Sequence, residues 1–220
     1  MSMDPNAVFD MLVERDVLAP SNGDLRKSDA FLDHVEAKQS DLPESIADQD
    51  DLLSEDEKTS LEKLIDVSPR AVAEYLTVVQ TCGDQLTDAE RTWVVSVLDT
   101  FEPDPVPDEG APELHIPISG QKVPFIEQFF KKAIVYFWRY DCDPCDLVRD
   151  DFNELLEVPD DEIAYFSVFG PNASELLYEE YDVGGAPTTL FFLNGRVDVR
   201  LVGASYPNVL EKEVNYLREL

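Results

Sequence analysis

Hydrophobic residues in the first hundred positions recur every three or four residues. This period is typical of amphipathic helices, which bury one face and expose the other. Four apolar stripes follow it: Val8/Leu12/Val13, Leu61/Leu64/Ile65, Val72/Tyr75/Leu76/Val79 and Trp93/Val94/Val97/Leu98. The pattern therefore predicts a small, mainly helical domain of about five helices.

Polar residues indicate where these helices begin. Ser54-x-x-Glu57 and Thr87-x-x-Glu90 match the capping box, in which two side chains satisfy backbone N–H groups of the first turn. Ser68-Pro69 predicts another helix start, because proline fits the first turn of a helix. Asn22-Gly23 lies between two short extended runs and predicts a hairpin turn. The acidic residues 41–57 are expected to form in part a mobile loop.

The hydrophobic pattern changes after residue 120, where short apolar runs alternate with amphipathic segments. In chain order we expect a strand at 133–138, a helix at 143–156, a strand at 163–169, a helix at 174–181 capped by Ser174, strands at 188–193 and 196–202, and a helix at 207–220. The two-residue turn Asn194-Gly195 joins the last two strands as a hairpin. This order predicts parallel strands with helical crossovers, followed by an antiparallel hairpin at the sheet edge.

Residues 102–120 separate the two patterns. They contain five prolines and no lysine or arginine, and they show almost no periodicity. Proline stiffens the chain and removes hydrogen-bond donors, so this composition predicts an extended linker. The expected organisation is a helical domain at 1–101, a linker at 102–120 and an α/β domain at 121–220.

Composition adds a strong negative charge. Among 220 residues there are 47 Asp and Glu against 17 Lys and Arg, which gives a formal net charge of −30. Intrinsic disorder does not fit, because it goes with few aromatic residues and this chain has 12 Phe, 8 Tyr and 2 Trp. A folded surface coated with carboxylates stays hydrated, and at 1 M salt a Debye length of about 3 Å screens its self-repulsion. In this respect the chain resembles proteins of halophiles that accumulate salt.

The charge also narrows the classes of partner. Nucleic-acid binding through phosphates depends on Lys and Arg, so an acidic chain argues against it, and also against docking on anionic lipid. The longest unbroken apolar run is six residues, at 133–138, whereas a membrane span needs about 20. The first residues have neither the basic start nor the apolar stretch of a secretion signal. We therefore expect a cytoplasmic protein with no membrane span.

The candidate chemistry lies in Cys142-Asp143-Pro144-Cys145, which follows a predicted strand and opens a predicted helix. Two cysteines in the first helical turn can close a small disulfide. The helix N–H groups near the first sulfur stabilise its thiolate and lower its pKa. That thiolate attacks a disulfide of a partner, and the second thiol then resolves the mixed disulfide. Pro144 suits the first turn of the helix.

Residues 121–220 resemble a thioredoxin domain. The resemblance is carried by the apolar strand 134–138 that leads to the two cysteines, by Gly185-Ala186-Pro187-Thr188, and by Asn194-Gly195 followed by Val202-Gly203-Ala204. It implies an α/β, thioredoxin-like fold with a central mixed β-sheet flanked by helices, preceded here by the small mainly helical domain.

The resemblance also implies roles for particular residues. Cys142 would attack, Cys145 would resolve, and Pro187 would be cis and face the cysteine pair. The backbone of Ala186 would pair with a substrate peptide. Trp138 would pack below the site and is the remaining candidate for substrate contact. The implied partners are protein or peptide disulfides and a protein or small-thiol reductant, with no cofactor beyond the redox-active disulfide.

Several positions depart from the family pattern. The family usually has Trp, Gly and a basic residue where this chain has Asp141, Asp143 and Asp146. These carboxylates should raise the pKa of Cys142 against the effect of the helix end. Tyr136 stands where the family has a buried Asp that is thought to help deprotonate the resolving cysteine. Water or Asp146 remain as proton acceptors for Cys145, and a narrower range of partners is expected.

The third cysteine and the two histidines are candidate metal ligands, but they can equally be ordinary side chains. Cys142 and Cys145 could be half of a zinc site, but zinc needs two more ligands. Cys82, His34 and His115 are scattered singly along the chain. We expect Cys82 to be a partly buried apolar residue and both histidines to be solvated.

Two functions follow from these observations. The first is a thiol–disulfide oxidoreductase acting through Cys142 and Cys145, whose helical domain selects the partner or recruits a reductant. The alternative is a redox-inactive thioredoxin-fold scaffold or protein-interaction module in a larger assembly. The match to three motifs favours the first function, whereas the acidic surround of the cysteines and the missing buried Asp are the reasons to keep the alternative.

Overall fold

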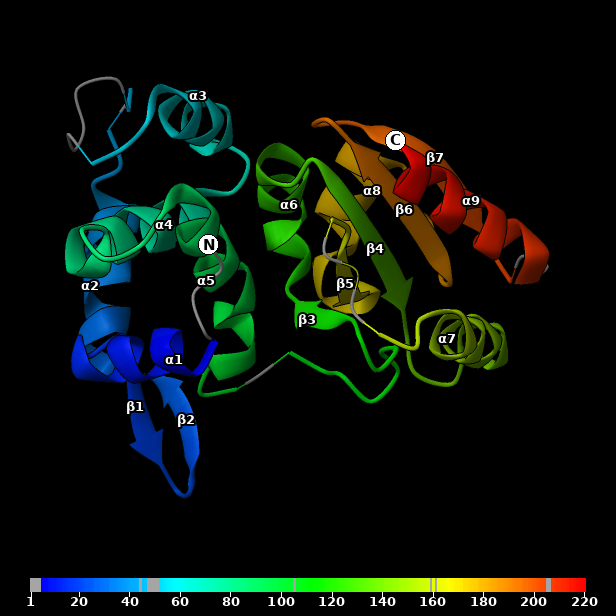
Figure 1. Ribbon diagram of the computed structural model, residues 1–220, viewed down its shortest axis with the longest axis horizontal. Helices are drawn as coiled ribbons and strands as arrows, with labels where there is room; N and C mark the ends of the chain where they lie inside the picture. Colours follow the sequence, from blue (N-terminus) through cyan, green and yellow to red (C-terminus); the bar gives the residue numbers. More distant parts are fainter. Residues whose placement is uncertain are drawn as a thin grey trace. The chain divides into compact units, whose positions relative to one another are not determined.

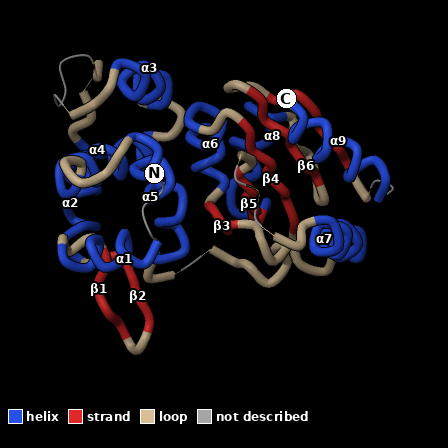
Figure 2. The backbone as a smooth tube through the Cα atoms, viewed as in Figure 1, coloured by secondary structure: helices blue, strands red, loops and turns tan. Residues whose placement is uncertain are grey.

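The computed structural model describes residues 5–43, 45–46, 52–104, 106–158, 160, 162–204 and 207–220. The chain divides into two compact units, residues 1–105 and residues 106–220. Figure 2 shows the first unit as helices with one two-stranded ribbon, and the second as a sheet flanked by helices. No helix among the described residues is both long and apolar enough to cross a membrane.

The N-terminal unit is mainly helical, as the apolar stripes predict. Its elements are α1 (Pro5–Glu14), β1 (Leu18–Ser21), β2 (Asp24–Lys27), α2 (Asp29–Ser40), α3 (Glu55–Leu64), α4 (Pro69–Cys82), α5 (Asp88–Val97) and the short 3₁₀ helix η1 (Leu98–Phe101). Helix α4 is buried along most of its length and forms the centre of the unit. The predicted hairpin is confirmed: β1 and β2 pair antiparallel, and Asn22 and Gly23 both have positive φ, as a tight hairpin turn requires.

Both predicted capping boxes are present, at Ser54–Glu57 and Thr87–Glu90. Pro69 opens α4, although Ser68 makes no side-chain cap there. Of the acidic loop expected at 41–57, residues 44 and 47–51 lie outside the described residues. Glu57, the predicted capping-box residue, is also buried and accepts hydrogen bonds from Tyr75 and from Arg91 Nε at 2.9 Å.

The C-terminal unit is built on one five-stranded mixed sheet. Its elements are β3 (Ile116–Ile118), η2 (Gly120–Lys122), α6 (Val123–Phe129), β4 (Lys132–Trp138), α7 (Asp143–Leu155), β5 (Ala164–Phe169), η3 (Gly170–Ala173), α8 (Ser174–Tyr181), β6 (Thr188–Leu193), β7 (Val197–Val202) and α9 (Pro207–Glu219). The strand order is β3-β5-β4-β6-β7. Strands β3, β5 and β4 are parallel, whereas β6 and β7 run antiparallel to their neighbours.

Helices cover both faces of this sheet (Figure 1). On one face, α7 and α9 pack over the side chains of Ile134, Tyr136 and Trp138 from β4. Side chains alternate between faces along a strand, and on the other face Tyr181 of α8 meets the ring of Phe192 from β6. The loops at the carboxyl end of β4 and the amino end of β6 lie together, and they hold the residues singled out in the sequence.

The structure differs from the sequence expectation between residues 106 and 120. This part of the proposed linker belongs to the C-terminal unit, and residues 116–118 form the edge strand β3. An edge strand tolerates Pro117, because one side of the strand needs no ladder hydrogen bonds. The sequence did not predict this strand, because three residues that include a proline show almost no hydrophobic periodicity. The N-cap residue of α8 also differs, since it is Ala173 and not Ser174.

Candidate active site at the Cys142–Cys145 disulfide

The two predicted cysteines form a disulfide at the junction of β4 and α7. Their sulfur atoms are 2.03 Å apart, and Cys142 is the N-cap residue of α7. The backbone N–H of Cys145 points at Cys142 Sγ across 3.2 Å. A donor aimed at this sulfur from a helix N-terminus favours the thiolate once the disulfide is reduced.

The loop before β6 lies against this disulfide. The Ala186–Pro187 peptide bond is cis, as expected from the sequence. The carbonyl oxygen of Ala186 is 3.8 Å from Cys142 Sγ. The exposed fractions of Cys142 and Cys145 are 6% and 3%, so both residues are buried. The fold thus brings the Cys142–Cys145 disulfide next to the Ala186–Pro187 peptide bond, which is distant from it in the sequence.

Three carboxylates surround the start of α7, and all three residues are exposed. Asp141 has a φ of 51°, in the left-handed region that Asp tolerates better than a bulky residue. Asp146 accepts a hydrogen bond at 2.8 Å from Arg149 Nη1, and its side chain is 58% exposed. Asp146 therefore lies on the solvent side with its own partner, whereas Cys145 is buried.

Tyr136 supports the first turn of α7. Its hydroxyl donates to the carbonyl oxygen of Cys145 at 2.8 Å. Burial raises the pKa of this phenol, so Tyr136 stays neutral and acts as a donor. A carboxylate at this position would be an acceptor, whereas the neutral phenol donates a hydrogen bond to the first turn of α7.

Trp138 lies beneath the site and not on its surface. Its side chain is buried, and its ring packs against Phe169 and Tyr140. Gly110 covers the ring so closely that a Cβ at residue 110 would lie 2.2 Å from it. Among the candidates for substrate contact, Trp138 is thus the one that the fold covers.

His115 was expected to be solvated, and the structure corrects this expectation. The imidazole is 5% exposed and packs against the rings of Phe152, Tyr165 and Tyr136, with centroid distances of 4.6, 5.5 and 6.4 Å. Burial lowers the pKa of His115 to about 3, so the ring is neutral at physiological pH. Sequence reasoning missed it because the residue lies in a proline-rich stretch without periodicity.

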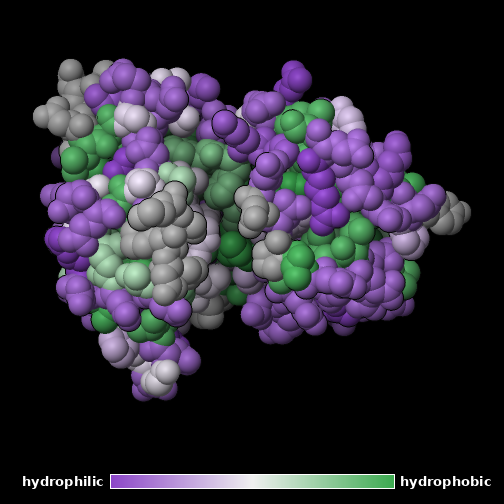
Figure 3. Space-filling view, in the orientation of Figure 1, coloured by the Kyte–Doolittle hydropathy of each residue, from purple (hydrophilic) through white to green (hydrophobic). Residues whose placement is uncertain are grey.

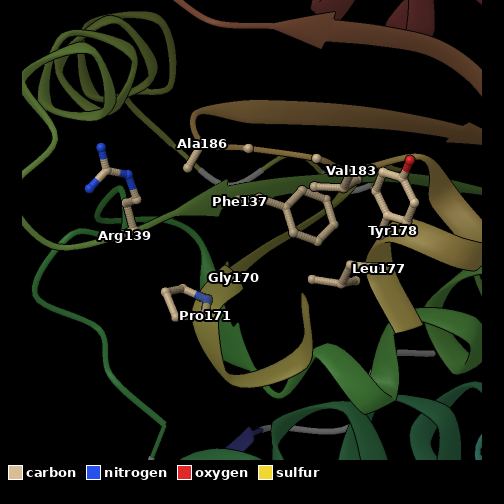
Figure 4. A pocket seen from close by; sticks show the side chains of 10 residues that line it. Phe137, Arg139, Gly170, Pro171, Leu177, Tyr178, Val183 and Ala186 are labelled. Atoms are coloured by element: carbon tan, nitrogen blue, oxygen red, sulfur yellow. The ribbon is translucent and has the colours of Figure 1, made fainter. Parts of the chain in front are cut away.

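A pocket of about 340 Å³ adjoins the disulfide on the α8 side of the sheet. Figure 4 shows Phe137, Leu177 and Val183 in its middle, with Arg139 at one end and Tyr178 at the other. Ala186 lines this pocket and also contacts Cys142. No sequence motif indicated the pocket, since its walls come from four separate segments.

One further group of acidic side chains lies in the N-terminal unit. Glu74, Asp99 and Glu102 are the one set among the described residues whose ligand atoms lie close enough to hold a metal ion. Lys27 already occupies this group, with its Nζ 2.6 Å from Glu74 Oε1 and 2.7 Å from Glu102 Oε1. The arrangement is a buried ion pair that holds β2 against α4.

No protein-family model and no curated protein matches the sequence. Solved structures do match, and several of them are thioredoxins. The thioredoxin of Malassezia sympodialis is 26% identical over 39% of this chain and 74% of that one, with a TM-score of 0.35. Mitochondrial thioredoxin 3 of Saccharomyces cerevisiae is 17% identical over 46% and 92%, with a TM-score of 0.40. A mutant thioredoxin from Halobacterium salinarum NRC-1 is 19% identical over 50% and 96%, with a TM-score of 0.41.

The C-terminal unit has a thioredoxin-like fold. Its own features carry this assignment: a mixed sheet of order β3-β5-β4-β6-β7 flanked by helices, a disulfide at the start of α7, and a cis proline beside it. The fold class expected from the sequence is confirmed, with an additional helical segment at the N-terminus.

Proposed function

We propose that this chain is a thiol–disulfide oxidoreductase that exchanges electrons with protein or peptide partners through Cys142 and Cys145. One observation carries the proposal: the sulfur of Cys142 caps α7 and also lies 3.8 Å from the carbonyl oxygen of Ala186. The same sulfur is thus activated by a helix end and placed beside the loop that would receive a peptide.

In the reducing direction, the Cys142 thiolate attacks one sulfur of the partner's disulfide. A Cys142–partner disulfide forms, and the other partner sulfur leaves as a thiolate. Cys145 then loses its proton and attacks Cys142 Sγ, which releases the second partner thiolate and closes the Cys142–Cys145 disulfide. Two electrons pass to the partner, and a dithiol protein or a small thiol restores the pair. The cysteine pair stores both electrons, so the reaction needs no bound cofactor.

The partner would lie extended along the loop before β6. The backbone N–H of Ala186 has no hydrogen-bond partner among the described residues, so it is open to a peptide carbonyl. Such strand-like pairing supplies affinity without reading a sequence. The N-terminal unit would then select the partner or recruit the reductant. The charge of −30 supports a salt-rich cytoplasm as the setting.

A redox titration tests the proposal. The protein is equilibrated in thiol–disulfide buffers in molar KCl, alkylated, and read by mass spectrometry. We expect a reversible two-electron transition between about −300 and −120 mV, the range of working exchange proteins. Cys142→Ser should abolish disulfide exchange, whereas Cys145→Ser should trap the mixed disulfide with the partner.

Full exchange activity in Cys142→Ser, or a pair that never forms a reducible disulfide, would overturn the proposal. Partner capture that is unaffected by substitution of both cysteines would then assign the unit to the alternative, a peptide-binding scaffold in a larger assembly.

A further inference from the structure

The pocket beside Ala186 offers an apolar interior next to the reacting sulfur. Phe137 of β4 and Leu177 of α8 form its base and are almost completely buried, and Val183 is 7% exposed. Tyr178 forms one end and is 61% exposed, so its ring is open to contact with a ligand. A volume of about 340 Å³ is enough for one or two bulky side chains, since an apolar cavity of about 150 Å³ holds a benzene ring.

Two glycines keep this pocket open. A Cβ at Gly184 would lie 3.8 Å from the ring of Tyr178, which is ordinary van der Waals contact, and a Cβ at Gly185 would meet nothing within 4 Å. Neither glycine has a φ in the left-handed region. A larger residue would thus fit the backbone at either position, and at residue 184 it would fill the space next to the Tyr178 ring.

Arg139 is the charged side chain that lines the pocket. It is exposed, and its Nη1 donates to the carbonyl oxygen of Tyr140 at 3.2 Å, but it makes no ion pair with any described carboxylate. Its guanidinium therefore keeps N–H donors and a positive charge that can pair with a carboxylate of a ligand. Figure 4 shows the guanidinium at the same end of the pocket as Ala186.

We propose that this pocket binds a substrate peptide that carries a bulky apolar side chain and a carboxylate within a few residues of its disulfide cysteine. The apolar side chain enters between Phe137, Leu177 and Val183. The carboxylate pairs with Arg139. Ala186 joins the two regions, because it lines the pocket and contacts Cys142. This inference rests on the proposed function and names its substrate class.

The carboxylate required of the peptide has the same sign of charge as the protein as a whole. Long-range attraction favours basic partners, whereas Arg139 at the pocket favours an acidic residue at that one point. Local pairing therefore acts as a selection step among partners that have already met the surface.

The test uses the reduced full-length protein and synthetic peptides, each with one cysteine linked by a disulfide to thionitrobenzoate. Attack by Cys142 on the peptide sulfur releases coloured thionitrobenzoate. The peptides carry Leu or Ser near the cysteine, combined with Glu, Gln or Lys in the next positions. The mixed disulfide of free cysteine and thionitrobenzoate, which has no side chain for the pocket, provides the reference rate.

We expect Leu peptides to react about tenfold faster than Ser peptides, since burying a leucine is worth roughly that factor. Among Leu peptides, Glu should exceed Gln by about two- to fivefold, and Lys should be slowest. Arg139→Glu should reverse the order to Lys, Gln, Glu. The matched control Arg196→Glu, which makes the same charge change at the exposed hairpin turn, should keep the original order. Gly184→Leu should remove the preference for Leu peptides, and Gly184→Ala should weaken it less.

The outcomes separate this inference from the proposed function. If the reference disulfide reacts through Cys142 but all peptides react at one rate, the pocket inference is wrong and the oxidoreductase stands. If peptide preferences persist in Arg139→Glu and Gly184→Leu, the pocket does not select the substrate. If Cys142→Ser reacts with the reference disulfide as fast as the native protein does, the proposed function itself fails.

Discussion

At the scale of single residues, the core behind the disulfide contains two buried side chains with polar atoms, Tyr136 and His115. Tyr136 donates to the first turn of α7, and the neutral ring of His115 packs against it. As the pH falls, the unfolded chain takes up a proton at this histidine, whereas the buried neutral ring of the folded state does not. Two properties of the site follow from these two side chains.

His115 should make the folded state sensitive to acid. Its pKa is about 3 when folded and about 6.5 when unfolded, so below pH 6.5 the unfolded state binds the extra proton. The stability contributed by the neutral ring is present above pH 6.5 and is lost as the pH falls towards 3. His115→Phe should therefore reduce the dependence of the unfolding free energy on pH by up to about 1.4 kcal/mol per pH unit in this window.

Urea unfolding at several pH values between 4 and 7 in molar KCl checks this expectation. His34→Phe, on the exposed face of α2, is the matched control and should follow the native protein. Parallel curves for His115→Phe and the native protein would contradict the buried, neutral state of His115.

Tyr136→Phe should remove one hydrogen bond without opening a cavity. The bond that is lost joins the phenol to the carbonyl of Cys145 in α7. Because one hydrogen bond contributes about 0.5–1.5 kcal/mol net, the unfolding free energy should fall by that amount. Because the bond holds the first turn of α7, the reduction potential of the cysteine pair should shift as well. Tyr216→Phe on the exposed side of α9 is the control. A potential unchanged in Tyr136→Phe would show that Tyr136 does not position the cysteines.

At the scale of elements, local signals and long-range contacts act together. The capping boxes at Ser54 and Thr87 start α3 and α5 from within the sequence. These helices then pack together through buried charged side chains, which the hydrophobic periodicity of the sequence does not predict. Glu57 of α3, for example, is held by Arg91 of α5 and Tyr75 of α4.

The buried ion pair between Lys27 and Glu74 gives a test at this scale. Both side chains are almost completely buried, so Lys27→Met leaves a carboxylate without its closest cation. The expected loss of unfolding free energy is about 3 kcal/mol. The double variant Lys27→Met, Glu74→Gln should recover part of this loss, because no buried charge then remains unpaired at these positions. Equal stability of the single and double variants in urea unfolding would contradict a compensating role for Lys27.

At the scale of the whole molecule, charge dominates the surface. In Figure 3 hydrophilic residues cover most of the visible face of each unit, and smaller hydrophobic patches lie among these hydrophilic residues. A net charge of −30 destabilises the compact state by self-repulsion when salt is low. The Debye length falls from about 10 Å at 0.1 M to about 3 Å at 1 M salt, which screens that repulsion.

The thermal midpoint should accordingly rise with KCl concentration, most steeply below about 1 M, where screening changes most. Scanning calorimetry from dilute buffer to molar KCl measures it, and sucrose serves as the uncharged control that acts by exclusion alone. A midpoint that responds equally to both, or not at all to KCl, would contradict an adaptation to salt.

The sequence by itself determined most of the elements and their class, although it predicted neither β3 nor α6. Helices with caps, the two hairpin turns and the buried strands follow from neighbours within a few residues, because backbone hydrogen bonds and side-chain periodicity are local. The thioredoxin-like arrangement and the cis state of Pro187 were expected from three short motifs and agree with the structure. The edge strand β3 escaped because three residues with a proline carry almost no periodic signal.

Only the tertiary structure decided what surrounds the cysteines. It buried His115 behind the disulfide and covered Trp138 with Gly110. It also joined β4, the turn after β5, α8 and the loop before β6 into one pocket with Arg139 at its end. These relations connect residues far apart in the chain, and packing in three dimensions, which no local pattern encodes, brings them together.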